Sequence, residues 1–262
     1  MIVRDAGDGY QIVFQTDHAT LSGQLAERWG NERFARPEPF EPMKIAAFRH
    51  DDGWSVWERA PRLDDEGRPQ NFLDRDVAVH LHLYRAAIAA VSEEDRYAGL
   101  LVSMHGAGLY KGRYAGEESP PLTGAASAQD LVDEFVREQE AHRGRLVEEM
   151  GLDETRLWTN YRLLQVYDRL SLYFCMNDLE GGEPASLEDV PVDYSAGRVD
   201  LKLAPAAPWR VRAQPFPFGE SPSRFTLLRR LVLKRDWPDH ESFRRDLFSA
   251  EPEVVEITVE SG

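Results

Sequence analysis

The chain has 262 residues and a formal net charge of -15, with 46 acidic against 31 basic residues. This acidic excess argues against nucleic acid or an anionic membrane as a partner, because nothing supplies a broad basic surface. No signal peptide begins the chain and no apolar run approaches the length of a membrane span, so we expect a cytoplasmic globular protein. The single cysteine, Cys175, excludes an intrachain disulfide.

Residues 2–14 have the pattern of a short β-hairpin that leads into a helix. In that helix His18 shares a face with Leu21 and Leu25, which predicts that its ring points into the core. Inward histidines near a helix start are commonly hydrogen-bonded core residues. For His18 taken alone, a structural role and metal ligation therefore both stay open.

The stretch from Met43 to Trp57 carries one apolar stripe, which predicts a second helix. His50 falls within this stripe and Asp51 lies on its flank, whereas Asp52 lies on the opposite side. Asp51 is therefore the better candidate for a ligand. A helix-surface pair is the alternative interpretation of the His50-Asp51 doublet.

A third helix is predicted over residues 77–91, with His80 at the edge of its apolar face and His82 turned away. We therefore expect His80 rather than His82 to be the ligand. A half-exposed polar side chain is the other interpretation of His80.

His105 ends the apolar run over residues 98–104, and the glycines after it predict a flexible loop that reaches about residue 124. Loops of this length in a compact domain are usually functional or mobile. Two basic side chains, Lys111 and Arg113, lie on the predicted loop.

Asp168 lies in the segment YRLLQVYDRLSLYFC, which is apolar almost all round and predicts a buried helix. An ionised carboxylate in that setting is costly unless a cation or hydrogen-bond donors compensate it. The compensating group is therefore expected to be a metal ion or a buried arginine.

Six side chains together form a candidate metal site: His18, His50, Asp51, His80, His105 and Asp168. Imidazole nitrogens and carboxylate oxygens suit one or two divalent transition-metal ions, namely Mn, Fe, Co, Ni or Zn. The set contains no thiolate, which excludes a structural zinc finger.

Beyond residue 177 the hydrophobic pattern changes from helical to alternating. An acidic linker is predicted over residues 177–191, followed by strands and one helix. We expect these strands to pair with the N-terminal hairpin in one small antiparallel sheet. The predicted fold is mostly α, a helical bundle with this small sheet (α+β overall). It forms a single domain over residues 1–262, with a helical metal-site core at 16–177 and a β-rich appendage at 195–262.

Four segments, QTDHATLSGQLA, HDDGWSVWE, YAGLLVSMHGAGLY and VYDRLSLYFC, together resemble the prokaryotic family known as domain of unknown function 3891 (DUF3891). That resemblance covers nearly the whole chain. The ligand order His, His-Asp, His, His, Asp, with the doublet written KIAAFRHDDGW, is similar to that of the HD-domain superfamily of metal-dependent phosphohydrolases. This similarity implies a helical bundle that holds the metal, with the doublet in the middle of a helix. The lysine that usually follows the doublet is absent, because Gly53-Trp54-Ser55 stand there.

The ligand set and the resemblance predict a metal-dependent hydrolase of a small phosphate ester or nucleotide. The expected ligands of a first ion are His18, His50, Asp51 and Asp168. His80 and His105 are left for a second ion, with Asp51 as the bridge, and these three residues are expected to act in catalysis. Lys111 and Arg113 are expected to hold the small anionic substrate.

Two other functions fit the same ligands. Helical His/Asp sites can also hold two iron ions that activate oxygen, which predicts an oxygenase of a small polar substrate. The remaining alternative is a metal-stabilised binding module without catalytic activity.

Overall fold

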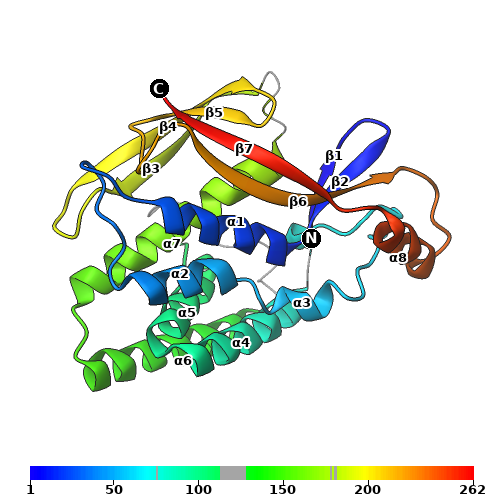
Figure 1. Cartoon of the computed structure of the whole chain (residues 1–262). Helices are drawn as coiled ribbons and strands as arrows, with labels where there is room; N and C mark the ends of the chain where they lie inside the picture. The colour runs from blue at the N-terminus through cyan, green and yellow to red at the C-terminus, as the bar shows by residue number, and fades with distance from the viewer. Residues whose placement is uncertain (75, 113–127, 178, 180–181) are drawn as a thin grey trace.

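A computed structural model describes residues 1–74, 76–112, 128–177, 179 and 182–262. Among these residues the chain forms a seven-stranded sheet with helices packed against it (Figure 1). The strands are β1 (Ile2–Asp5), β2 (Gly9–Val13), β3 (Ala185–Pro191), β4 (Arg198–Ala207), β5 (Arg210–Gln214), β6 (Ser223–Leu233) and β7 (Glu253–Ser261). The helices are α1 (Gln15–Arg28), α2 (Phe40–Arg49), α3 (Trp54–Trp57), η1 (Phe72–Asp74), α4 (Val77–Glu94), α5 (Arg96–Tyr110), α6 (Gln129–Met150), α7 (Glu154–Met176) and α8 (His240–Ser249).

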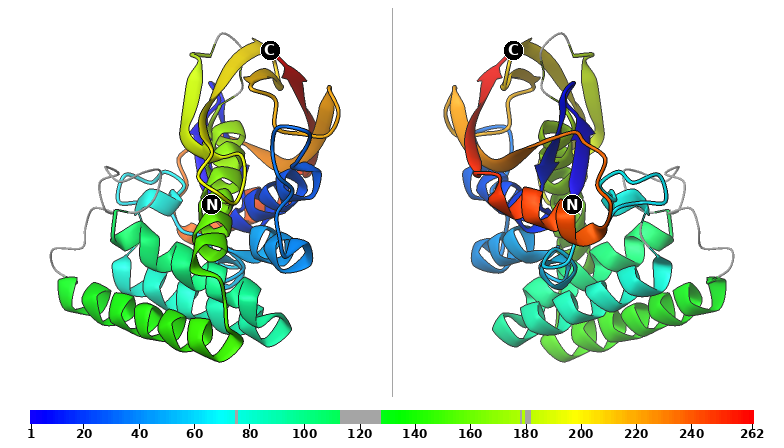
Figure 2. Two further views of the ribbon diagram at one scale, coloured as in Figure 1. Left: turned by 90° about the vertical axis from the view of Figure 1, so that its left-hand side faces the viewer. Right: turned by 90° about the vertical axis from the view of Figure 1, so that its right-hand side faces the viewer.

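The strand order in the sheet is β1-β2-β6-β7-β5-β4-β3. Strand β2 of the N-terminal hairpin pairs antiparallel with β6, with Gly9 opposite Leu233 and Ile12 opposite Arg230. Strands β5 and β7 run parallel, so the sheet is mixed. Figure 2 shows that the strands curl around α1 and α7, which lie on the inner side of the curve.

The fold class expected from the sequence, a mostly helical bundle with a small antiparallel sheet, is therefore wrong. The predicted pairing of the N-terminal hairpin with the C-terminal strands is present between β2 and β6, but the sheet has seven strands and contains a parallel pair. Strand β3 also lies within residues 177–191, where the sequence predicts a linker. A register shift between Leu187 and Val190 interrupts the alternation of buried and exposed side chains in β3. Such an irregularity hides the period of two by which a strand is recognised in a sequence.

Helices α1 and α7 lie directly against the sheet, α1 against β6 and α7 against β3 and β1. On its other sides α7 packs against α1, α2 and α5. Helix α7 is therefore covered on all sides, which explains why its sequence is apolar almost all round. Helices α4 and α6 lie farther from the sheet and pack against α5 (Figure 1).

The His50-Asp51 doublet does not lie within a continuous helix. Helix α2 ends at Arg49 with His50 as its C-cap, and α3 begins at Trp54. The prediction of one helix from Met43 to Trp57, with the doublet in its middle, is therefore wrong. At Gly53 an added Cβ would lie 2.0 Å from the carbonyl oxygen of Leu83 in α4. The turn is thus pressed against the α4 backbone, a tertiary contact that helical periodicity does not report.

Helix α5 continues through His105 to Tyr110, so the predicted start of a loop at residue 105 is also wrong. Gly106 and Gly108 lie inside the helix. A Cβ at Gly108 would lie 1.8 Å from the hydroxyl oxygen of Tyr161, and one at Gly106 would lie 2.7 Å from the ring of Tyr84. These glycines allow two tyrosines to pack against the helix.

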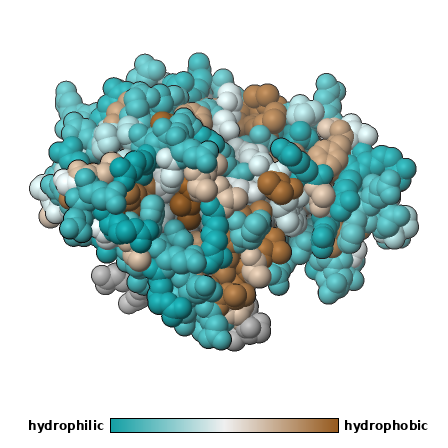
Figure 3. All heavy atoms as spheres, turned by 90° about the horizontal axis from the view of Figure 1, so that it is seen from below, coloured by the Kyte–Doolittle hydropathy of each residue, from teal (hydrophilic) through white to brown (hydrophobic). Residues whose placement is uncertain are grey.

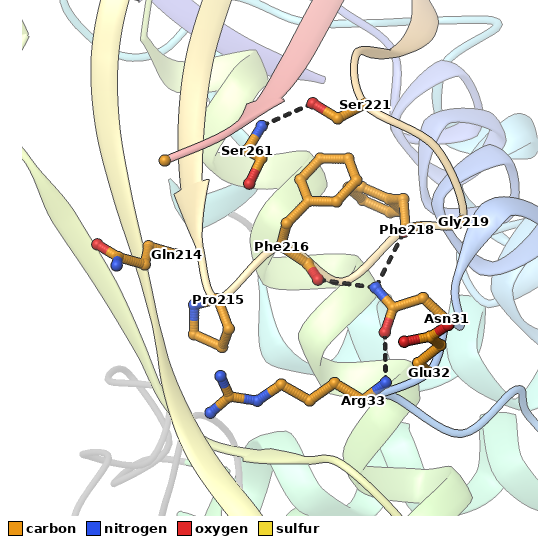
Figure 4. A pocket seen from close by; sticks show the side chains of 11 residues that line it. Asn31, Glu32, Arg33, Gln214, Pro215, Phe216, Phe218, Gly219, Ser221 and Ser261 are labelled. Atoms are coloured by element: carbon orange, nitrogen blue, oxygen red, sulfur yellow. Dashed lines mark hydrogen bonds between the residues drawn. The ribbon is translucent and has the colours of Figure 1, made fainter.

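The PFPF sequence at residues 215–218 forms a corner beside the sheet. The Nδ2 of Asn31 donates hydrogen bonds to the carbonyl oxygens of Phe216 and Phe218, at 2.9 and 3.0 Å (Figure 4). Its Oδ1 accepts a bond of 2.8 Å from the backbone N–H of Arg33. Asn31 thereby ties the segment after α1 to the corner between β5 and β6.

No helix in the described part of the chain is both long and apolar enough to span a membrane. The face seen in Figure 3 is mainly hydrophilic, with apolar side chains in separate patches. The exposed large apolar side chains include Leu73 and Met176, at 53% and 44% exposure.

Candidate metal centre

Three helices bring three side chains to one buried point: His18 from α1, His50 from the end of α2 and Asp168 from α7. Nε2 of His18 lies 2.8 Å from Oδ1 of Asp168, and Nε2 of His50 lies 3.5 Å from the same oxygen. The two Nε2 atoms are 3.3 Å apart. Both histidines are 0% exposed and Asp168 is 4% exposed. The ligand atoms lie within 4.8 Å of one another, so this buried His-His-Asp group can hold a metal ion.

Asp51 and His105 flank this group. Oδ2 of Asp51 lies 3.9 Å from Nε2 of His18 and 3.8 Å from Nε2 of His50. On the other side, Nε2 of His105 lies 3.7 Å from Oδ2 of Asp168. The neighbouring Asp52 instead bonds to Arg49 at the surface of α2, at 2.6 Å. The orientation predicted for Asp51 relative to Asp52 is therefore confirmed, while its coordination of a metal stays a prediction.

His80 lines a cavity together with His18, Asp51 and Asp168. It is 3% exposed, whereas His82 is exposed on the opposite face of α4, as predicted. Its Nδ1 bonds to the hydroxyl of Tyr110, and its ring centroid lies 4.8 Å from that of Tyr84. Five of the six predicted ligands thus line one cavity, and the sixth, His50, lies against His18 and Asp168.

The hydrogen bonds behind the two central histidines set their tautomers. Nδ1 of His50 lies 3.0 Å from the carbonyl oxygen of Ala47, which can only accept, so Nδ1 carries a proton. Nδ1 of His18 lies 2.7 Å from Oγ of Ser171, whose own proton is donated to the carbonyl oxygen of His18 at 2.8 Å. Both rings can therefore present the Nε2 lone pair to a cation, the usual arrangement of metal-ligating histidines.

Asp51 is held in place by one donor on each oxygen. Nε2 of Gln15 donates to Oδ2 and the hydroxyl of Tyr84 donates to Oδ1, both at 3.1 Å. The Oε1 of Gln15 is buried and has no hydrogen-bond partner among the described residues. A buried acceptor of this kind at a cavity wall fits a water or ligand that donates to it.

The carboxylates and burial shift the pKa values of the site in opposite directions. Burial lowers the pKa of His50, but Asp51 and Asp168 outweigh it and raise that pKa to about 9. Burial also opposes ionisation of Asp168, yet its hydrogen bonds with His18 and His50 hold its pKa well below the usual range. For His105 burial dominates and lowers the pKa to about 4. Without a metal, His50 is thus a cation at neutral pH, and metal must displace its proton.

A family model described as a protein of unknown function (DUF3891) matches residues 1–234, which include all six predicted ligands. The chain belongs to this family. No curated protein and no solved structure matches it.

A cavity of about 250 Å³ opens onto the candidate metal centre of the DUF3891 chain. Its polar lining residues are Gln15, His18, Asp51, His80, His105 and Asp168, and its aromatic and aliphatic ones are Trp54, Phe72, Leu73, Tyr84, Leu109, Leu172 and Met176. No lysine or arginine lines it among the described residues. A larger, open hollow of about 650 Å³ lies around the PFPF corner (Figure 4) and shares no lining residue with this cavity.

The structure describes only one of the two residues predicted to bind substrate. Nζ of Lys111, directly after α5, lies 3.3 Å from Glu140 of α6, and Lys111 does not line the cavity. Arg113 lies outside the described residues. Their predicted roles stay predictions.

Sequence reasoning missed the residues that support the ligands, above all Gln15, Tyr84 and Ser171. A signal was present for two of them. Gln15 precedes His18 by one helical turn, and Tyr84 follows His80 by one turn, so each shares a helix face with a predicted ligand. Ser171 stands in the same relation to Asp168 on α7, but a serine in an apolar helix carries no distinctive pattern.

Proposed function

We propose that this DUF3891 protein is a metal-dependent hydrolase of small phosphate esters. The observation that supports it is the convergence of His18, His50 and Asp168, with Asp51 and His105 within 3.9 Å of their ligand atoms. The order of these residues along the chain is also similar to that of the HD-domain phosphohydrolases.

His18, His50 and Asp168 would hold one ion, and His105, His80 and Asp51 would supply donors for a second. A divalent ion bound there would lower the pKa of a coordinated water from 15.7 towards about 7 and polarise a phosphoryl oxygen. The chain's own groups then orient the reactants. The free Oε1 of Gln15 can accept a hydrogen bond from the attacking water, and Tyr84 and Gln15 fix Asp51.

The number of bound ions determines the formal charge of the site and therefore the charge of the substrate that it can accept. The carboxylates of Asp51 and Asp168 contribute two negative charges, and no lysine or arginine from the described residues lines the cavity. One divalent ion would leave the site formally neutral, whereas two would leave an excess of two positive charges. A phosphate ester dianion therefore requires the second ion, because an unpaired anion in a buried site is costly.

The same lack of basic lining residues favours a second candidate function. A di-iron oxygenase acting on a small uncharged polar substrate needs no cation other than its iron ions. An iron-loaded, coloured protein that consumes oxygen in the presence of substrate and hydrolyses no phosphate ester would establish this alternative. A higher melting temperature with metal, combined with no activity of either kind, would indicate the non-catalytic binding module.

The direct test is metal content. Elemental analysis of protein purified without added metal is expected to find a divalent transition metal in the wild type and in His82→Ala, but none in Asp168→Ala. His82 is the matched control because it is an exposed histidine on α4 that faces away from the cavity. Equal metal retention in the two variants would contradict the ligand set.

Activity is measured on the same preparations. A screen of phosphomonoesters and phosphodiesters with Mn, Co, Ni and Mg is expected to show turnover that Asp168→Ala abolishes. A metal-loaded wild type that hydrolyses none of them would contradict the hydrolase while leaving the metal site intact.

A further inference from the structure

The polar and the apolar side chains that line the cavity differ in burial. The candidate metal ligands in the lining are buried, whereas Phe72, Leu73, Leu109, Leu172 and Met176 are partly or largely exposed and form its entrance. These apolar side chains come from η1, α5 and α7, so three separate elements build one apolar entrance.

The entrance residues are not completely buried by the protein itself. Leu73 is 53% and Met176 is 44% exposed, and Phe72, Leu109 and Leu172 are half-buried. Large apolar side chains left accessible around a cavity commonly mark the place where an apolar ligand group binds. In a chain with a net charge of -15, this apolar rim contrasts with the surrounding surface.

The cavity volume limits what fits. About 250 Å³ corresponds to roughly eight water molecules at about 30 Å³ each. Pockets that enclose drug-sized ligands occupy about 300–1,000 Å³. A nucleotide is of that larger size and is also rich in polar groups that Leu109 and Leu172 cannot satisfy.

We infer that the substrate is a phosphate ester of a short apolar alcohol and not a nucleotide. This inference rests on the proposed function. The phosphate lies at the metal ligands, and the hydrocarbon part lies between Phe72, Leu109 and Leu172. In the reaction, the water oxygen forms a bond to phosphorus and the ester P–O bond breaks. A water proton ends on the released alcohol, so water is the only co-reactant.

The test uses n-alkylphosphonates, which carry a P–C bond that the enzyme cannot hydrolyse. Methyl- to hexylphosphonate are titrated into the manganese-loaded full chain by isothermal titration calorimetry. Each added CH₂ is expected to tighten binding about two- to fourfold until the cavity is filled. Adenosine 5′-monophosphate is expected to bind no more tightly than methylphosphonate.

A matched pair of variants locates the effect. Met176→Gln is expected to weaken the dependence on chain length, because it places an amide at the apolar entrance. Leu131→Gln is the control, since Leu131 is exposed to the same 44% but lies on α6 away from the cavity lining. The control is expected to keep the wild-type dependence.

The outcomes separate this inference from the proposed function. Phosphonates that bind with the same affinity from methyl to hexyl, or adenosine monophosphate that binds more tightly than all of them, would overturn the apolar substrate. A matching series of n-alkyl carboxylates is the second arm. If carboxylates gain affinity with chain length and phosphonates do not bind, the apolar cavity is supported and the phosphohydrolase is overturned. Absence of binding in both series would overturn both.

Discussion

The tautomer of His18 depends on a single hydroxyl. Oγ of Ser171 donates to the carbonyl oxygen of His18 and faces its Nδ1, so it holds the ring with Nε2 toward the metal centre. Ser171→Ala is expected to lower metal affinity about 10- to 100-fold, the usual effect of losing a partner behind a ligand. Competition titration with a chelating dye measures this affinity. Ser22→Ala is the control, because Ser22 is also a fully buried serine but bonds to the backbone of Tyr167. Equal affinities in the two variants would contradict the role of Ser171.

The hydrogen bond from Tyr84 to Asp51 is tested by removing one oxygen atom. Tyr84→Phe removes the hydroxyl that donates to Oδ1 and keeps the ring that packs against Gly106 and His80. We expect about a tenfold loss of metal affinity with little change in the free energy of unfolding. Tyr173→Phe is the control, because the Tyr173 hydroxyl has no hydrogen-bond partner in the described part of the chain. A loss of stability as large as the loss of metal binding would indicate a packing role instead.

The turn between α2 and α3 carries Asp51 and directly follows His50. Gly53 has a φ of -57°, which any residue adopts, so glycine is required there by space and not by backbone conformation. An added Cβ would lie 2.0 Å from a backbone oxygen of α4 and would force the turn away. Gly53→Ala is therefore expected to cost about 1–3 kcal/mol of stability and to weaken metal binding, since Asp51 lies in the same turn.

Gly144 is the control for the Gly53→Ala substitution, because an added Cβ there meets no neighbouring atom. Gly144 lies in α6 with nothing within 4 Å of an added Cβ. Gly144→Ala is expected to stabilise the protein by up to about 1 kcal/mol through helix propensity and to leave metal binding unchanged. Urea denaturation and metal titration of both variants compare the two positions. A stable, metal-binding Gly53→Ala protein would show that the turn has room to move.

Element by element, the sequence predicts which side chains are buried better than where helices end. The helical phase correctly separated His80 from His82 in α4, because a helix face repeats every 3.6 residues whatever buries it. Asp51 and Asp52 are also oriented as predicted, although they lie in the turn after α2 and not in a helix. The break after His50 and the continuation of α5 past His105 were not predictable in this way. Both depend on contacts with helices elsewhere in the chain, where glycine serves close packing instead of a turn or loop.

The number of strands in the sheet and its mixed topology were also not predicted from the sequence. Local patterns indicated the N-terminal hairpin and the C-terminal strands, but they contain nothing that reports the parallel pairing of β5 with β7. The bulge in β3 also removes the alternating signal at that edge of the sheet. As a result, the predicted small sheet lacked an edge strand and the mixed topology.

At the scale of the whole molecule, the candidate metal centre lies between helices that also pack against the sheet. Its central ligands come from α1, α2 and α7, and α1 and α7 also support the sheet. A cation bound between them stabilises the folded state only, so metal is expected to raise the global unfolding temperature. The metal-free protein instead has to hold a buried cationic His50 between two carboxylates.

This difference predicts how the stability of metal-free protein depends on pH. The pKa of His50 is about 9 in the folded chain and 6.5 as its ordinary value, so its stabilisation is fully present below pH 6.5 and is lost as the pH rises through 9. His105 behaves in the opposite way, because its folded pKa is about 4. Its contribution is present above pH 6.5 and is lost as the pH falls through 4. Each change corresponds to roughly 3 kcal/mol at full extent.

The measurement is the free energy of unfolding in urea from pH 4 to 9, in the presence of a chelator. Wild type minus His50→Gln reports the alkaline loss, and wild type minus His105→Gln reports the acid loss, because titrating groups distant from the substituted histidine cancel in each difference. With saturating metal the alkaline loss is expected to disappear, since a bound ion replaces the proton on His50 and affinity rises about tenfold per pH unit up to 9. A wild-type profile without metal that stays parallel to that of His50→Gln between pH 6.5 and 9 would show that His50 is not the cation at this centre.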